Sequence, residues 1–170
     1  MGLKANICQV CGGALKNCGT YYKCICCDTE FRIEDSMTKA EVEAYFDRLN
    51  DFADAERNLS VSPPRFDEAE SEFGLIVQKY PDWSAGYWGL VRAKFGIKFE
   101  QDLSGKAVPS CYKSSYEDFR DTDEYKKAVA LAETNELRQS YEKMAEYIAR
   151  VAKEWRAEAQ KYDYWRQCVW

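Results

Sequence analysis

Over most of its length the chain carries apolar side chains at the three- and four-residue spacing of amphipathic helices. The pattern predicts a first helix that begins at the capping box of Thr38 and Glu41 and ends near Leu59. A second helix is predicted over 65–79 and a third from 84 to 95 or 98, with prolines before and after the second. The chain is therefore expected to be mainly helical.

The C-terminal half predicts a loop followed by two helices. Between 100 and 115 the helical pattern stops, and a glycine and a proline indicate a hairpin-like loop. A short helix is predicted over 124–132 with Asp123 as N-cap, and a long one over 134–165. The apolar positions of the long helix are Leu137, Tyr141, Met144, Ile148, Val151, Trp155, Tyr162 and Trp165.

These apolar positions of the long helix follow a nearly heptad spacing. At 1.5 Å per residue the helix would be about 48 Å long, more than the rest of the domain needs. We expect part of it to project and to pair with a second copy or with a partner. The alternative is that the stripe covers the other helices of the same chain.

The first 35 residues have a different pattern, with short strand-like runs between cysteines. Two CxxC pairs, Cys8 with Cys11 and Cys24 with Cys27, are separated by twelve residues. Two residues between cysteines let a tight turn direct both sulfurs at one point, and two such turns complete a tetrahedron. We therefore predict a zinc ribbon that holds one structural Zn²⁺ through these four cysteines.

The cysteines also allow other interpretations. Cys18 lies inside the loop and Cys26 adjoins Cys27, so either could replace a ligand; Cys27 is preferred because it completes the two-residue spacing. Buried free thiols or an iron–sulfur cluster are alternatives. A thioredoxin-type redox site is not expected, because neither pair lies in a βαβ pattern.

The composition excludes several kinds of catalytic site. The chain has 170 residues, 46% of them hydrophobic and 15% aromatic, and no histidine. That size suits one domain with a sizeable core. Without histidine there can be no Ser-His or Cys-His nucleophilic site and no His-containing zinc site. We find no candidate active site in the sequence and predict that the protein is not an enzyme.

The charge argues against nucleic acid as a partner. The formal net charge is −5, although residues 1–33 alone carry +2. A zinc ion with four thiolates adds about −2 and makes the ribbon roughly neutral. Tyr21, Tyr22 and Lys23 could still stack on bases and contact phosphate, so a nucleic-acid-binding zinc ribbon is the alternative function.

The chain also shows no targeting or membrane signal. No apolar run approaches the 18 residues needed to span a bilayer, and the first residues lack the apolar block of a signal peptide. We expect a cytoplasmic protein that does not contact membranes. In that reducing compartment, closely spaced cysteines are more often metal ligands than disulfides.

The first two predicted helices, as a pair, and the third that follows them resemble a tetratricopeptide repeat over about residues 41–98. The matching positions are Ala69, Phe73, Ile76, Pro81, Tyr87 and Leu90. An ordinary helical hairpin is the alternative, since so few units would not form a solenoid. The resemblance implies that Ala85, Trp88, Arg92 and Phe95 line a concave surface for a protein partner.

The whole order of segments resembles the N-terminal region of bacterial proteins that carry a C-terminal Toll/interleukin-1 receptor (TIR) domain. The matching segments are the zinc ribbon, the repeat-like helices, YWGLVRAKFGI at 87–97 and DEYKKAVALA at 123–132. The TIR domain itself is missing from this chain, so its activity cannot be transferred. The resemblance implies the recognition or regulatory part of a signalling or defence system.

Together these observations predict three segments and one function. Residues 1–35 form the zinc ribbon, 36–133 a tetratricopeptide-like helical domain, and 134–170 the long C-terminal helix. We expect a non-enzymatic module that binds a protein of unknown identity, with self-association through the C-terminal helix as a further possibility.

Overall fold

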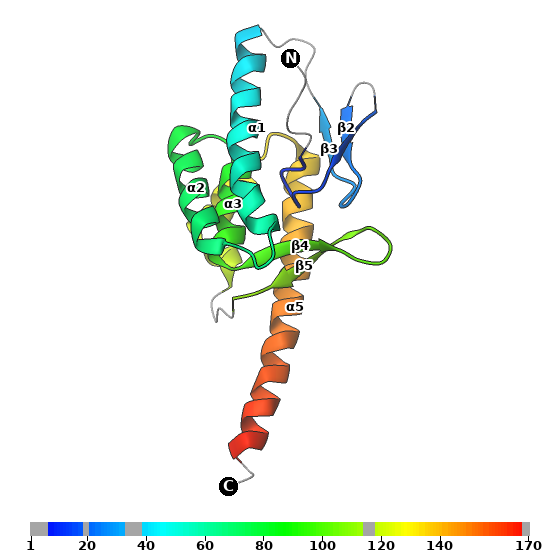
Figure 1. Ribbon diagram of the computed structural model, residues 1–170, viewed down its shortest axis with the longest axis vertical. Coiled ribbons are helices and arrows are strands. Elements are labelled where there is room, and N and C mark those ends of the chain that lie inside the picture. Colours follow the sequence, from blue (N-terminus) through cyan, green and yellow to red (C-terminus); the bar gives the residue numbers. More distant parts are fainter. Residues whose placement is uncertain (1–6, 19–20, 33–38, 114–117, 168–170) are drawn as a thin grey trace.

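The computed structural model describes residues 7–18, 21–32, 39–113 and 118–167, and it is mainly helical, as predicted (Figure 1). Its elements in chain order are β1 (Leu15–Asn17), β2 (Tyr21–Cys24), β3 (Glu30–Arg32), α1 (Lys39–Ser60), α2 (Phe66–Lys79), α3 (Ser84–Lys94), β4 (Ile97–Gln101), β5 (Ala107–Cys111), the 3-10 helix η1 (Phe119–Asp121), α4 (Asp123–Ala130) and α5 (Asn135–Gln167). No described helix is long and apolar enough to cross a membrane.

The N-terminal segment folds as a three-stranded antiparallel sheet in the order β1-β2-β3. Leu15 lies opposite Cys24 in the first pair of strands, and Lys23 lies opposite Glu30 in the second. Strand β2, which leads into the second CxxC pair, is one of the short strand-like runs predicted between the cysteines. The sheet lies beside the helices (Figure 1). The first cysteine turn precedes β1, and the second joins β2 to β3.

Helices α1, α2 and α3 pack on one another around an aromatic centre. The Phe52 ring meets the Phe73 ring edge-on at 5.4 Å and the Trp83 ring at 5.7 Å. Gly89 allows α3 to approach α2, because a Cβ at this position would overlap the Phe73 ring. The three predicted helices are therefore confirmed, and each ends within a few residues of its expected bound.

The chain turns into a β-hairpin after α3, so the helical units do not continue. Strands β4 and β5 pair antiparallel, with Phe99 opposite Pro109. Gly105 has φ +80° at the hairpin turn, a conformation that glycine adopts without strain. The sequence indicated a hairpin-like loop here but not its strands. The likeness of α1–α3 to a tetratricopeptide repeat stays a prediction.

Helix α4 begins with a different cap from the predicted one. The Thr122 side chain, not Asp123, is the N-cap, and its hydroxyl accepts a hydrogen bond from the Tyr125 backbone N–H. Asp123 instead lies in the first turn, where its negative charge interacts favourably with the positive end of the helix dipole. For α5, the Thr134 hydroxyl likewise accepts from the Leu137 N–H.

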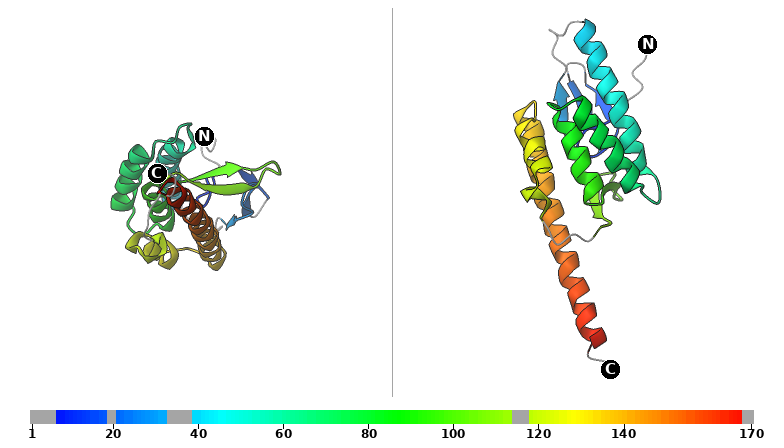
Figure 2. Two further views of the ribbon diagram at one scale, coloured as in Figure 1. Left: turned by 90° about the horizontal axis from the view of Figure 1, so that it is seen from below. Right: turned by 90° about the vertical axis from the view of Figure 1, so that its left-hand side faces the viewer.

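Helix α5 covers the domain with its first half and extends away from it with its second half (Figures 1 and 2). In the first half Leu137, Tyr141, Ala145 and Ile148 are buried. This part of the predicted stripe therefore packs in cis. The side chains of Trp155, Tyr162 and Trp165 lie outside the described residues, so the structure does not test their part of the prediction.

The interior shows no packing boundary at residue 35 or at residue 133. One core cluster includes cysteines of the ribbon, Trp88 of α3, Phe119 of η1, Ala128 of α4 and Tyr141 of α5. Residues from all three predicted segments thus share one interior. We treat the described chain as a single packing unit with a projecting helix.

Candidate metal centre

The two cysteine turns are copies of one backbone arrangement, sixteen residues apart. In the first turn the Cys8 N–H donates to the Gly13 carbonyl and the Gly12 N–H donates to the Cys8 carbonyl. In the second, the Cys24 N–H donates to the Thr29 carbonyl and the Asp28 N–H donates to the Cys24 carbonyl. The residue after each pair has positive φ, +74° at Gly12 and +60° at Asp28. Such matched turns bring the sulfurs of one pair to face those of the other.

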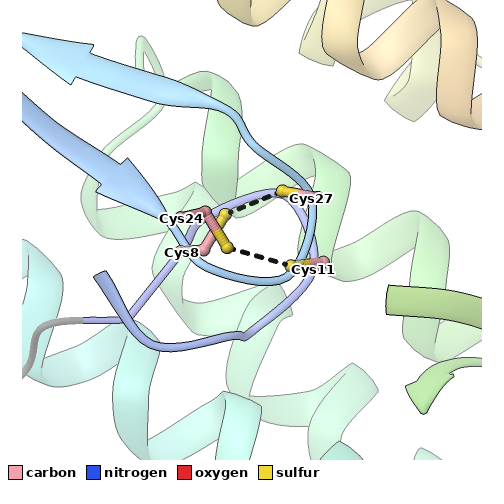
Figure 3. Close-up of side chains that lie close together, drawn as sticks. All are labelled: Cys8, Cys11, Cys24 and Cys27. Atoms are coloured by element: carbon pink, nitrogen blue, oxygen red, sulfur yellow. Dashed lines mark hydrogen bonds between the residues drawn. The ribbon is translucent and has the colours of Figure 1, made fainter. Parts of the chain in front are cut away.

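The four sulfurs gather around one point (Figure 3). The Sγ atoms of Cys8 and Cys27 are 3.5 Å apart, those of Cys11 and Cys24 are 3.6 Å apart, and all four lie within 4.8 Å of one another. A tetrahedral ion with metal–sulfur bonds of about 2.3 Å places its sulfurs about 3.8 Å apart. The cluster therefore fits a tetrahedral thiolate site, and it is the one predicted from the CxxC spacing.

Backbone N–H groups support the first sulfur of each turn. The Val10 N–H donates to the Cys8 sulfur at 3.4 Å, and the Cys26 N–H donates to the Cys24 sulfur at 3.3 Å. Such bonds stabilise the negative charge of a thiolate and fix the direction of its lone pairs. They are the outer shell that a metal site needs around its ligands.

The titration of the four thiols favours a cation among them. Burial raises the pKa of Cys8 well above its usual value, and a hydrogen bond with the Cys24 sulfur raises the pKa of Cys11. A hydrogen bond with the Cys11 sulfur lowers the pKa of Cys24 and of Cys27. Four thiolates in one buried cluster would repel one another, so full ionisation requires a positive ion at the centre.

The two alternative cysteines point elsewhere. The Cys26 side chain is buried, and its sulfur accepts a hydrogen bond from the Gln101 side-chain amide at 3.1 Å. The Cys18 side chain is exposed and its thiol donates to the Lys16 carbonyl. Neither belongs to the four-cysteine cluster, which contains Cys27 and not Cys26.

The first turn of the ribbon lies directly on the helices. The Trp88 indole N–H donates to the Val10 carbonyl at 2.7 Å, and both residues are buried. Gly12 lies against Glu56 of α1 so closely that a Cβ there would overlap the Glu56 carboxylate. Any larger residue at position 12 would therefore have both a backbone strain and a collision.

The second turn contacts the hairpin and α5. The Ala107 N–H of β5 donates to the Cys26 carbonyl at 3.0 Å. The Thr29 hydroxyl lies 3.1 Å from the Cys27 sulfur and donates to the Ser140 hydroxyl of α5 at 3.3 Å. The metal centre thus connects α1, α3, the hairpin and α5, which no local pattern in the sequence indicated.

The predicted partner surface on α3 is wrong as an exposed surface. The exposed fractions are 0% for Ala85, 0% for Trp88 and 1% for Arg92, and Phe95 is half-buried against Phe119 at a ring distance of 5.8 Å. The face that would be concave in a tetratricopeptide repeat is covered by the ribbon and by neighbouring helices of the same chain. These four residues hold the domain together instead of presenting a groove.

Arg92 has a charged partner inside the domain. Its two terminal nitrogens donate to the two carboxylate oxygens of Glu56 at 2.7 and 2.9 Å. The guanidinium also lies 4.9 Å from the Phe99 ring centre. The buried pair spans α1 and α3 beside the first cysteine turn.

The candidate nucleic-acid contacts on the ribbon are partly engaged. Lys23 forms an ion pair of 3.6 Å with Asp28, and the Tyr22 hydroxyl accepts from the Asn17 amide. Tyr21, Tyr22 and Lys23 are all half-buried. Among the described residues, no observation favours this alternative function.

Comparison of the chain with family models, with curated proteins and with solved structures finds no match.

Proposed function

We propose that the four-cysteine cluster holds Zn²⁺ and that the ion is structural. Zinc binds four thiolates in a tetrahedron in structural sites. Its filled d shell imposes no other coordination geometry, so the arrangement of the four cysteines suits it. All four positions are supplied by the protein, so none is left for a water molecule or a substrate. This closed ligand set is the observation that carries the proposal.

The metal test uses two measurements on the full chain. Native mass spectrometry should show one zinc per chain, and Co²⁺ in its place should give the intense visible absorption of a tetrahedral thiolate site. A folded, metal-free ribbon would contradict the proposal. An iron–sulfur cluster would show instead as iron and sulfide with its own visible spectrum.

The proposed function of the whole chain is a non-enzymatic protein-interaction or regulatory module. The one metal-ligating cluster among the described residues lies in the core and ties the ribbon to the helices, a use typical of structural zinc. The resemblance to the N-terminal regions of bacterial TIR-domain proteins supports a recognition or regulatory role. A protein with such a role would act on an effector encoded separately or on a domain of a longer chain.

The products of the neighbouring genes are the first candidates for the partner. Each would be co-expressed with the zinc-loaded chain and tested for a complex of defined stoichiometry by size-exclusion chromatography. We expect a complex that survives purification and that changes the activity of the partner. Catalytic turnover by the chain alone, or no complex with any neighbouring product, would contradict the proposed function.

A further inference from the structure

A groove of about 620 Å³ lies between the β4–β5 hairpin and the middle of α5. The hairpin crosses α5 where the helix leaves the body of the domain (Figure 1). The apolar part of its lining comes from Val108 and Pro109 of β5 and from Met144 and Tyr147 of α5. None of these groups belongs to the metal centre, and the groove is distinct from the α3 face discussed above.

Three cations surround this apolar lining: Lys106 at the hairpin, and Lys143 and Arg150 on α5. All three are exposed, and none forms an ion pair within the described part of the chain. The chain as a whole has a net charge of −5, so three cations around one apolar lining form a local positive region. The Arg150 guanidinium lies 5.1 Å from the Tyr147 ring centre, whereas Lys106 and Lys143 can meet a ligand carboxylate without first breaking an ion pair.

Two carboxylates also lie at the groove, and they differ in what they can do. One Asp102 carboxylate oxygen accepts hydrogen bonds from the Ser104 N–H at 2.8 Å and from the Lys106 N–H at 3.0 Å. The Ser104 hydroxyl donates to the same oxygen at 2.6 Å, and this bond, together with the Lys106 N–H bond, lowers the pKa of Asp102 and keeps its charge on the hairpin turn. Glu146 is exposed and leaves the local balance at +1, from three cations and two carboxylates.

The two walls of the groove are held in place before any ligand arrives. Asp102 fixes the hairpin turn, and the Ala107 N–H joins β5 to the ribbon through the Cys26 carbonyl. On the other wall, the buried side chains of Tyr141, Ala145 and Ile148 anchor this part of α5 in the core. Preorganised walls lower the entropy lost when a ligand binds.

Backbone pairing with β5 is not the mode of recognition that the groove favours. Pro109 in the middle of the strand has no N–H group, and the Ala107 N–H is already engaged with the ribbon. A peptide could therefore form few ladder hydrogen bonds along this edge. Recognition would depend on side chains that fill the apolar lining and on acidic groups that meet the cations.

We propose that this groove binds a segment of a partner protein that combines acidic with aliphatic or aromatic side chains. The apolar side chain would lie on the half-buried Val108 and Met144, beside the buried Pro109, and carboxylates would face Lys106, Lys143 and Arg150. This inference rests on the proposed function as a protein-interaction module. It names the surface and the chemistry of the partner.

The test selects peptides from a phage-displayed library of random dodecapeptides on the zinc-loaded full chain. Selected peptides are then measured by fluorescence anisotropy against the full chain and against the Lys143→Glu/Arg150→Glu variant. A matched control, Lys126→Glu/Arg138→Glu, makes the same change in net charge at two exposed cations that do not line the groove. Circular dichroism and zinc content verify that both variants fold.

We expect the selected peptides to be acidic and to contain large apolar residues. The groove variant should weaken their binding by about tenfold or more, the effect of losing central charged contacts, while the control stays within about twofold. Binding should also weaken as salt rises. Peptides that bind the groove variant and the unchanged chain with equal affinity would contradict the groove as the binding site. The proposed function as an interaction module would not be affected.

Other outcomes of these experiments would also contradict the proposal. Selection of basic peptides would overturn the proposed partner chemistry. If the full chain formed a dimer that the groove variant abolished, the occupant would be a second copy and the proposal would be wrong. If no peptide were enriched and no neighbouring gene product formed a complex, the groove and the proposed function would fail together.

Discussion

Arg92 and Glu56 form an ion pair that is almost completely removed from water, with side-chain exposures of 1% and 4%. The Arg92 Nε atom is buried and has no hydrogen-bond partner among the described residues. Taking two charges into the interior costs several kcal/mol each, and their attraction offsets this cost only while both are present. The pair therefore makes α1 and α3 sensitive to the loss of either member.

The Arg92→Met variant should lower the free energy of unfolding by about 3–5 kcal/mol, because it leaves the Glu56 carboxylate buried without a counter-charge. The double variant Glu56→Leu/Arg92→Met should lose markedly less than the single one. Urea denaturation followed by circular dichroism measures both. The surface pair of Lys79 and Asp51 is the control, and Lys79→Met should lower the free energy of unfolding far less than Arg92→Met. Equal losses in the single and double variants would show that packing, not charge, determines the effect.

A second residue-scale prediction separates ligand cysteines from the others. Cys24→Ser should abolish tight zinc binding, because the cluster loses one of its four thiolates. Cys18→Ser should retain one zinc per chain, since Cys18 is exposed and its thiol contacts a backbone carbonyl. Metal analysis after gel filtration decides between them. Retention of zinc by the Cys24→Ser variant would exclude the assigned ligand set.

At the scale of elements, α5 has two parts with different surroundings. Up to Ile148 its apolar stripe is buried in the core, whereas the C-terminal part of the helix extends away from the domain (Figure 2). Isolated helical segments of this length are only marginally stable in water. The sequence of the projecting part keeps three of the aromatic residues predicted for the stripe: Trp155, Tyr162 and Trp165.

We predict that the projecting part of α5 mediates association. Sedimentation of residues 1–170 at tens of micromolar should show a dimer or mixed association, and truncation after Glu154 should reduce it, because the truncation removes the distal apolar positions. The truncated chain should keep its zinc and its helical signal for α1–α4. A full chain that stays strictly monomeric under these conditions would rule out self-association and leave the helix free for another partner.

At the scale of the whole molecule, the metal centre and the helices share one interior. Trp88 donates to the Val10 carbonyl, and buried cysteines lie in the same cluster as Tyr141 and Ile148. We therefore expect the ribbon and the helical body to unfold together. A ribbon connected only by its chain would unfold alone.

Zinc removal should accordingly reach the helices. A strong chelator should lower the midpoint of thermal unfolding of the whole chain by about 10 °C or more, as expected for losing several kcal/mol in a domain of this size. The far-ultraviolet circular dichroism signal at 222 nm reports the helices, and excess zinc should restore it. Unchanged helical stability after verified metal loss would mean that the ribbon is energetically separate.

The charge of the whole molecule predicts weak binding to nucleic acid. The net charge is −5, and Lys23 is already paired with Asp28, so few cations can displace the counterions of a phosphate backbone. Anisotropy titrations with single-stranded DNA, duplex DNA and RNA at physiological salt should give affinities weaker than micromolar. Tight binding that falls steeply with salt and disappears in Lys16→Glu/Lys23→Glu would instead support the alternative function.

The sequence alone determined the features that depend on neighbours along the chain. Two residues between cysteines impose a tight turn, so the four ligands could be read from their spacing, including Cys27 in preference to Cys26. The period of apolar residues likewise predicted all five helices, because amphipathicity is a property of one segment. The strands of the hairpin escaped prediction because IKFEQ, although it alternates, is short and directly follows a predicted helix, while AVPSC contains a proline.

The tertiary structure decided which apolar faces are covered and by what. Trp88 and Arg92 have the pattern of interface anchors, yet Trp88 meets a ribbon residue 78 positions away and Arg92 a carboxylate 36 positions away. The groove between the hairpin and α5 likewise combines residues from separate segments. A helical pattern predicts that one face of the helix is buried. Which segment covers that face depends on the packing of distant parts of the chain, which local spacing does not encode.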